Sequence, residues 1–159
     1  MPILEYVCSV WDPYQQKYID KIEKIQRAAS RFVTNCRSNE PGCITEILES
    51  LQWQSLKARR QESRLKLLHS CIYGNSVIKL PEYIKPLNNV YNTRNHHPSK
   101  FYPPFGQINS FRFSFFPKAI SDWNELPKCI TSQQNKEQFS RELACYMKTR
   151  EAGICRDGH

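Results

Sequence analysis

Apolar side chains recur at helical spacing in the first quarter of the chain, and this pattern restricts the fold more than any other feature. The steps are 4, 3, 4 and 3 residues, the period of an α-helix. Residues 12–13, Asp and Pro, favour a helix start, because the carboxylate can accept from unpaired N–H groups and proline there loses no hydrogen bond. The pattern predicts a helix over Tyr14–Thr34. The apolar residues on its face are Tyr18, Ile22, Ile25, Ala29 and Phe32.

Similar periodicity predicts four more helices. A short one follows residue 43 and ends near Trp53, and a longer one covers Leu56–Tyr73, where Gly and Asn at residues 74–75 provide a stop. Another begins at Pro117 and ends at Leu126, and the last begins near Asn135. The last helix is expected to bury four residues: Phe139, Leu143, Tyr146 and Met147.

The stretch between these helices has a different character. Prolines stand at 81, 86, 98, 103 and 104, and proline disfavours helix both at its own position and at the residue before it. We expect one turn of helix at 81–84, an irregular arm over 90–110, and a short strand or extended segment at 111–115, where phenylalanines alternate with Arg112 and Ser114.

The predicted fold class is therefore mainly α: a small helical bundle with a Pro-rich irregular arm and a short extended aromatic segment. Four segments are expected. Residues 1–76 form a thumb-like helical bundle, 77–116 a Pro-rich basic arm, 117–150 C-terminal helices that pack on the bundle, and 151–159 a disordered tail. The large aromatic residues on apolar patterns are expected to pack in a core: Trp53, Phe115, Phe116 and Trp123.

The charge balance favours a polyanionic partner. The chain has 23 Lys and Arg against 15 Asp and Glu, a formal net charge of +8, and residues 76–118 carry six basic side chains and one acidic one. Charge alone does not choose between nucleic acid and a membrane surface. No apolar run approaches the ~18–20 residues that cross a bilayer. The seven cysteines and the lack of an apolar leader favour an intracellular protein, cytoplasmic or nuclear and not secreted.

A basic cluster on the helix at 56–73 is the first candidate site. Arginine can bind phosphate oxygens through two N–H groups, and cations along one helix can follow a phosphate backbone. A solvated helix face is the alternative interpretation. The cluster consists of Lys57, Arg59, Arg60, Arg64 and Lys66. A secondary basic face is weaker, because Asp20 and Glu23 interleave with it; it consists of Lys17, Lys21 and Lys24.

The arm combines cations with aromatic rings, which suits single-stranded nucleic acid. The alternative is a loop whose rings cover the bundle. The candidate residues are Arg94, His96, His97, Lys100, Phe101 and Tyr102.

The sequence gives little support for a metal site or for a catalytic nucleophile. His96 and His97 are adjacent and would point to opposite sides of an extended chain. Cys36 and Cys43, with six residues between them, fit no common zinc spacing, nor do the cysteines at 145 and 155. No metal and no cofactor is expected, and buried or incidental thiols are the preferred interpretation. No small-molecule substrate is expected either.

Four blocks of sequence, taken in order, resemble the region that follows the palm in jockey-like and related LINE (non-LTR) retrotransposon reverse transcriptases. The resemblance covers roughly residues 2–145. The first block is PILEYVCSVWDPY at 2–14 with IEKIQRAASRFV at 22–33, and the second is LQW at 51–53 with LKARR at 56–60. The third is TRNHHP at 93–98, and the fourth is SFFPKAISDWNELP at 114–127.

The resemblance implies a thumb-like helical bundle with a C-terminal extension that holds template and primer, so RNA, DNA or an RNA–DNA hybrid is the expected partner. A reverse transcriptase palm is a further expected partner. The family's palm carries an Asp-Asp pair that holds two metal ions. The chain contains no Asp-Asp pair, and we expect palm, fingers and endonuclease to be absent from it. We therefore expect no enzymatic activity but a nucleic-acid-binding fragment of a transposable element. The alternative is an inactive remnant or protein-interaction module.

Overall fold

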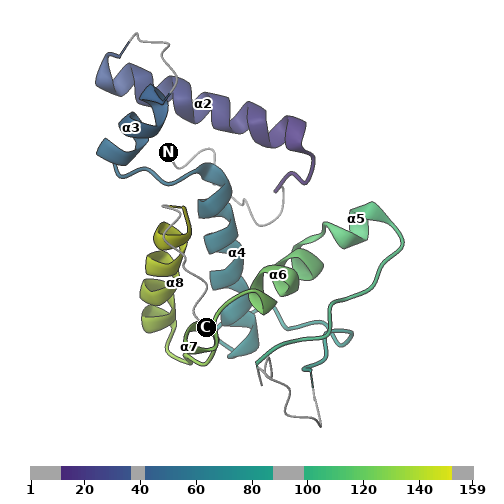
Figure 1. Ribbon diagram of the computed structural model, residues 1–159. Coiled ribbons are helices and arrows are strands. Elements are labelled where there is room, and N and C mark those ends of the chain that lie inside the picture. Colours follow the sequence, from purple (N-terminus) through teal and green to yellow (C-terminus); the bar gives the residue numbers. More distant parts are fainter. Residues whose placement is uncertain (1–11, 37–41, 88–98, 152–159) are drawn as a thin grey trace. The chain divides into compact units, whose positions relative to one another are not determined.

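The computed structural model describes residues 12–36, 42–87 and 99–151, and it is mainly helical in these ranges (Figure 1). This confirms the predicted fold class. The described residues contain no strand, but they include one isolated antiparallel bridge between Pro86 and Phe101. The helices are α2 (Gln16–Thr34), α3 (Cys43–Ser50), α4 (Leu56–Ile72), α5 (Asn109–Arg112), α6 (Phe115–Asn124), α7 (Lys128–Thr131) and α8 (Lys136–Glu151).

The described chain divides into two units within α4, between Arg60 and Gln61. The first unit holds α2, α3, the start of α4 and residues 148–151, and the second holds the rest of α4 with α5 to α7 and most of α8. The segment boundaries predicted from sequence follow residues 76, 116 and 150, and they stay a prediction. Residues 152–159 of the predicted tail lie outside the described residues, and Glu151 ends α8.

The first predicted helix is confirmed, but it begins at Gln16, two residues later than expected. Gln15 precedes it with an extended backbone and no side-chain cap. Asp12, which was predicted to start this helix, lies three residues before its N-cap position. Its carboxylate accepts a hydrogen bond from Arg60 Nε at 2.9 Å, because Arg60 is buried and requires a compensating charge.

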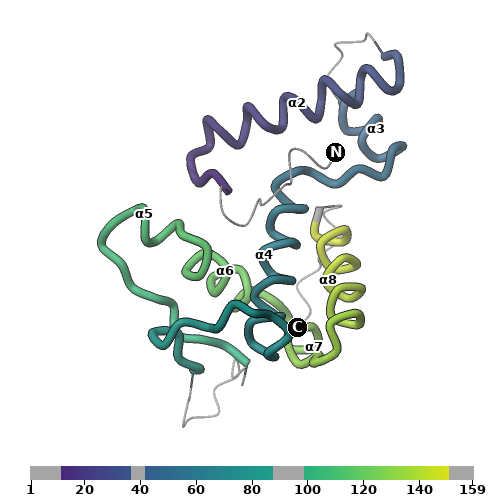
Figure 2. The backbone as a smooth tube through the Cα atoms, turned by 180° about the vertical axis from the view of Figure 1, so that it is seen from behind, coloured from purple at the N-terminus to yellow at the C-terminus, as the bar shows by residue number. Residues whose placement is uncertain are grey.

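The buried face of α2 differs from the apolar face seen in the sequence. Gln26 is 2% exposed and Ser30 fully buried, whereas Phe32 is 87% exposed and Ile25 49%. Figures 1 and 2 both show α3 beside the C-terminal part of α2. The polar face is buried because Gln26 bonds to the backbone between α3 and α4: its Nε2 donates to the Gln54 carbonyl at 2.8 Å.

Side chains of α2 cap the N-terminus of α4, whose first N–H groups lack partners within the helix. Gln26 Oε1 accepts from the Leu56 N–H at 3.1 Å, and Glu23 Oε1 accepts from the Lys57 N–H at 2.8 Å. The Ser55 hydroxyl oxygen accepts from the Ala58 N–H at 3.1 Å. This cap joins α2 to α4 by directional bonds, which a hydrophobic pattern does not reveal.

We expect Gln26→Ala to lower the free energy of unfolding by about 1–3 kcal/mol, because the Gln54 carbonyl would lose its bond to Gln26 and the Leu56 N–H would keep only its longer bond to Glu23. Urea unfolding followed by circular dichroism measures the change. Gln16→Ala is the matched control, since Gln16 lies on the same helix with an exposed bond to Asp20, and it should stay within about 0.5 kcal/mol of wild type. Equal losses in the two variants would contradict the capping role.

The core of the second unit forms where α4, α6 and α8 meet. It includes Trp123 at 1% exposure and fully buried Leu65, Leu68, Phe139 and Leu143. Figures 1 and 2 show α8 alongside α4 in this unit. The core position of Trp123 is confirmed, and Phe115 and Phe116 pack against the same cluster while partly buried. Trp53, in the first unit, is half-buried. Asn135 Oδ1 caps α8 by accepting from the Glu137 and Gln138 N–H groups.

The prediction of an extended segment at 111–115 is wrong. Residues 109–112 form the single turn α5, and α6 begins at Phe115. The backbone is satisfied locally, because the Phe113 N–H donates to the Asn109 carbonyl at 3.0 Å and the Ser114 hydroxyl donates to the Phe111 carbonyl at 2.7 Å. No described strand lies beside it to offer ladder hydrogen bonds. The turn of helix expected at 81–84 is a hydrogen-bonded turn, closed by the Ile84 N–H on the Pro81 carbonyl.

His69 is fully buried in the second unit. Its Nε2 lies 2.8 Å from the Gln133 carbonyl, and its ring stacks on Phe139 with centroids 4.1 Å apart. Burial lowers the pKa of His69, the Gln133 carbonyl opposes this, and the charge of Lys136 lowers the pKa further. The folded state therefore favours the neutral ring.

This pKa shift makes stability depend on pH. Because the folded pKa lies below the unfolded value of about 6.5, the unfolded chain takes up the proton first, and stability falls as pH drops below that value, by at most about 1.4 kcal/mol per pH unit. Urea unfolding at pH 7.5 and 5.5 measures the loss. His69→Gln, which does not titrate, should lose less between the two pH values. A loss as large as that of wild type would show that His69 is not the source.

Candidate nucleic-acid interface

The central arginines of the α4 cluster are buried in ion pairs. Arg60 is 2% exposed and pairs with Asp12. Arg64 is 4% exposed, and its Nε donates to Asp122 Oδ2 at 2.8 Å, while Gln61 Nε2 donates to the other carboxylate oxygen at 3.1 Å. A phosphate would have to displace a carboxylate and reach below the surface to contact either guanidinium. We therefore leave Arg60 and Arg64 out of the candidate interface.

The remaining cations of α4 differ in exposure and in their partners. Lys57 is exposed and Arg59 half-buried. Lys66 is half-buried and pairs with Glu62, one helical turn away, at 2.6 Å. Sequence reasoning placed all five cations in one cluster because it could not see the acidic partners of Arg60 and Arg64, which lie 48 and 58 positions away.

The secondary basic face on α2 is open to solvent. Lys17, Lys21, Lys24 and Arg27 are all exposed. The ammonium groups of Lys17 and Lys21 each lie 5.8 Å from the centre of the Tyr18 ring, within the range of a cation–π contact. We call these four cations the α2 basic row.

The acidic residues that interleave with the α2 basic row are engaged in other bonds. Glu23 accepts from the N–H groups of Leu56 and Lys57 at the start of α4. Asp20 accepts from Gln16 Nε2 at 2.8 Å. Their charges still reduce the local potential, but neither carboxylate forms a described ion pair with the row. Asp20 and Glu23 therefore count less against this basic face than they did in the sequence.

The part of the arm that the structure describes is anchored on α6. Asn124 forms two hydrogen bonds with the Phe101 backbone, at 2.8 and 3.0 Å, and Trp123 Nε1 donates to the Ser99 carbonyl at 2.8 Å. Phe101 is buried, so its ring is not available for stacking, and Lys100 is half-buried. Arg94, His96 and His97 lie outside the described residues.

Of the exposed rings beyond Phe101, Tyr102 was a candidate in the sequence, whereas Phe105 was not. Phe105 is 88% exposed and Tyr102 49%, and the Arg112 guanidinium lies 5.9 Å from the Phe113 ring centre. The available signal was the position of Phe105 directly after two prolines, which disfavour helix there.

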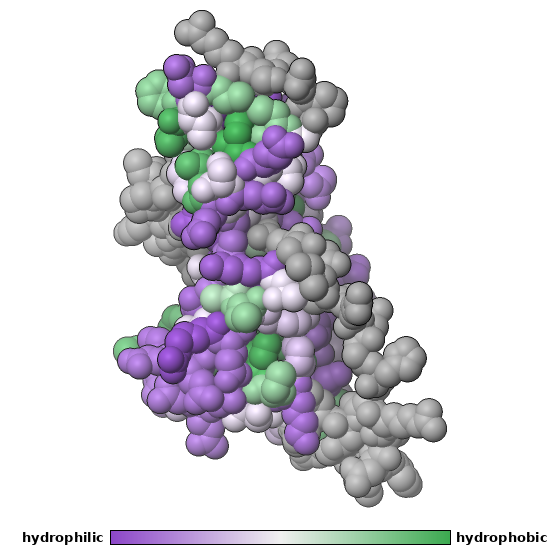
Figure 3. Space-filling view, turned by 60° about the vertical axis from the view of Figure 1, so that its left-hand side comes forward, coloured by the Kyte–Doolittle hydropathy of each residue, from purple (hydrophilic) through white to green (hydrophobic). Residues whose placement is uncertain are grey.

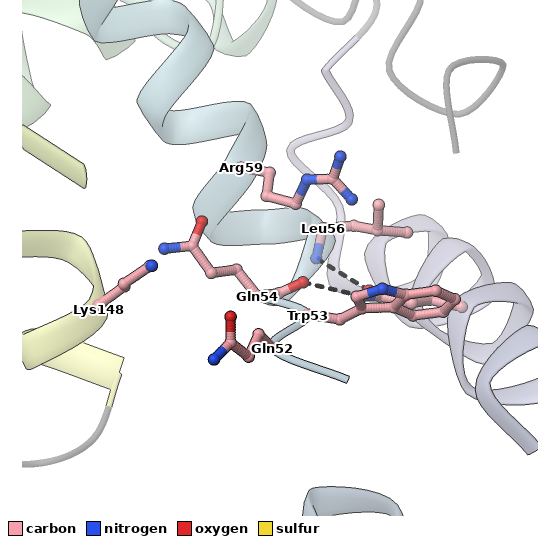
Figure 4. A pocket seen from close by; sticks show the side chains of 7 residues that line it. Gln52, Trp53, Gln54, Leu56, Arg59 and Lys148 are labelled. Atoms are coloured by element: carbon pink, nitrogen blue, oxygen red, sulfur yellow. Dashed lines mark hydrogen bonds between the residues drawn. The ribbon is translucent and has the colours of Figure 1, made fainter. Parts of the chain in front are cut away.

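A pocket of about 340 Å³ lies at the start of α4 (Figure 4). Because Glu23 and Gln26 already accept from the first N–H groups of α4, the helix end offers little to an anion in this pocket. The lining residues are Gln26, Gln52, Trp53, Gln54, Leu56, Arg59 and Lys148.

In the described ranges, His, Cys, Asp and Glu side chains form no group of three or more that could hold a metal ion. None of the described helices combines the length and the apolar character needed to cross a bilayer.

Comparison of the chain with protein-family models, with curated proteins and with solved structures finds no match in any of the three.

Proposed function

We propose that this chain binds RNA, DNA or an RNA–DNA hybrid through the α2 basic row, without catalysing a reaction. The observation that carries the proposal is that Lys17, Lys21, Lys24 and Arg27 are all exposed on one helix. The resemblance to the region that follows the palm in the sequence of LINE reverse transcriptases supports the same partner. On this proposal the chain is a fragment of such an enzyme, acting in the cytoplasm or nucleus.

The spacing of the row suits a phosphate backbone. Lys17 and Lys24 are seven residues apart, which is about 10 Å along a helix at 1.5 Å per residue. Three base-pair steps of a strand cover about the same distance. Exposed lysines on a helix position a backbone without reading its sequence, so the binding should be tolerant of sequence.

The exposed rings near Phe105 provide a second surface for the same class of ligand. Aromatic faces stack on unpaired bases of any sequence, typically for about 1–3 kcal/mol per base. Phe105 and Tyr102 supply the rings, and Arg112 and exposed Lys85 supply charge in the same unit. A preference for substrates with a single-stranded extension would indicate that this surface takes part.

Fluorescence anisotropy with a labelled hybrid duplex tests the proposal. Four phosphate contacts give a salt slope near −3.6, so affinity should fall about a hundredfold between 50 and 200 mM salt. Circular dichroism establishes that the protein is folded under both conditions. Failure of the folded protein to bind at 50 mM salt would refute the proposal.

Exposed apolar residues favour one alternative, a protein-interaction module. Phe32, Val33 and Ile25 of α2 are 87%, 59% and 49% exposed, and hydrophobic side chains lie open beside hydrophilic ones on the α2 and α3 part of the surface (Figure 3). Such a face could pack against a reverse transcriptase palm. Size-exclusion chromatography separates the two functions: a monomer that binds nucleic acid supports the first, and self-association without binding supports the second.

A further inference from the structure

Two cysteine sulfurs meet where α2 gives way to α3. Cys36 lies two residues after the end of α2, and Cys43 is the first residue of α3. Their Sγ atoms are 3.4 Å apart, and both residues are half-buried. A disulfide requires about 2.05 Å between the sulfurs, so a small side-chain adjustment brings them to bonding distance.

The other described cysteines differ from this pair. Cys71 is buried, and burial raises the pKa of its thiol, which disfavours the reactive thiolate. Cys129 and Cys145 are exposed. Among the described cysteines, a contact between two sulfurs is found for Cys36 and Cys43. From the sequence, Cys36 and Cys43 were interpreted as buried or incidental thiols, because spacing alone does not show that their sulfurs lie close together.

We propose that Cys36 and Cys43 form a reversible dithiol–disulfide site that hydroperoxides oxidise. One thiolate attacks the peroxide, and its sulfur becomes a sulfenic acid while the peroxide is reduced to water or an alcohol. The second thiolate then attacks that sulfur and displaces hydroxide, which leaves as water. For hydrogen peroxide, two thiols and one peroxide give one disulfide and two waters. The bond joins the end of α2 to the start of α3, and the site does not depend on nucleic-acid binding.

Peptide mapping of the full chain tests the site. Arg37 separates the two cysteines, so trypsin places Cys36 in a peptide of residues 32–37 and Cys43 in one of residues 38–57. After treatment with a small excess of hydrogen peroxide and blocking with N-ethylmaleimide, we expect these peptides joined, about 2 Da lighter than their sum because two hydrogens are lost. Dithiothreitol should separate them. Full maleimide labelling of both cysteines after peroxide would overturn the proposal, as would linkage mainly through Cys129 or Cys145.

Variants and a second reagent sharpen the test. Cys36→Ser and Cys43→Ser should each abolish the linked peptide, whereas Cys145→Ser, a matched change at an exposed cysteine, should retain it. Phenylarsine oxide bridges neighbouring thiols, and in the wild-type protein it should protect Cys36 and Cys43 from maleimide but leave Cys129 labelled. This measurement requires no substitution, so it decides the matter even where a serine variant does not fold. Equal labelling of all three cysteines would contradict the pairing.

Discussion

Arg64→Ala is expected to lower the free energy of unfolding by about 3–5 kcal/mol, because it leaves a largely buried carboxylate without its charge partner. The Asp122 side chain is 16% exposed and that of Arg64 5%. Gln61 would remain as a neutral donor to Asp122, which does not replace a guanidinium. Urea unfolding at pH 7.5 measures the loss.

Two further variants identify the cause of that loss. Lys66→Ala removes a cation from the same helix, but its pair with Glu62 is 38% exposed at the lysine, so about 0.3–0.5 kcal/mol is expected. The double variant Arg64→Met with Asp122→Leu removes both charges and should recover most of the stability. It keeps the net charge unchanged, and we expect it to bind nucleic acid with wild-type affinity. Weaker binding by the folded double variant would show that Arg64 belongs to the nucleic-acid interface after all.

Replacing Lys17, Lys21 and Lys24 with glutamine is expected to weaken nucleic-acid binding about ten- to hundredfold at low salt. Each lysine that contacts a phosphate releases condensed counterion when it binds, and removing such contacts weakens all sequences uniformly. Stability should change little, because all three side chains are exposed. Anisotropy titration at fixed salt gives the ratio of dissociation constants.

A triple variant in the second unit is the matched control. Lys128→Gln, Lys136→Gln and Arg141→Gln remove the same total charge from exposed positions on α7 and α8. If binding depends on the α2 basic row, this control should retain most of the affinity. Equal weakening by both triple variants would mean that net charge, and not the row, governs binding.

The positions of the main helices could be predicted from the sequence, but the buried face of α2 could not. Apolar periodicity located α2, α3, α4, α6 and α8, because packing in a small bundle requires that spacing. On α2, however, Gln26 and Ser30 are buried while Phe32 is exposed. The hydrogen bonds of Gln26 with the Gln54 carbonyl and the Leu56 N–H decide this, and partners about 30 positions away leave no periodic signal.

The candidate site was predicted only in part, for a related reason. Sequence identified both basic helices, but it preferred α4 because Asp20 and Glu23 interleave with the lysines of α2. Burial of Arg60 and Arg64 depends on Asp12 and Asp122, which only the fold brings near. The alternating phenylalanines at 111–115 resembled a strand, yet local bonds such as that from Ser114 to the Phe111 carbonyl close turns there. Alternation predicts a strand only where a neighbouring strand can pair.

The most direct test of the central claim, that the α2 basic row contacts a phosphate backbone, is the salt slope of binding. The logarithm of the association constant for a hybrid duplex is measured against the logarithm of salt concentration, for wild type and for the Lys17, Lys21 and Lys24 triple variant. Each lost contact should make the slope shallower by about 0.9, so a difference of about 2.7 is predicted. Identical slopes and affinities for the two proteins would contradict the claim.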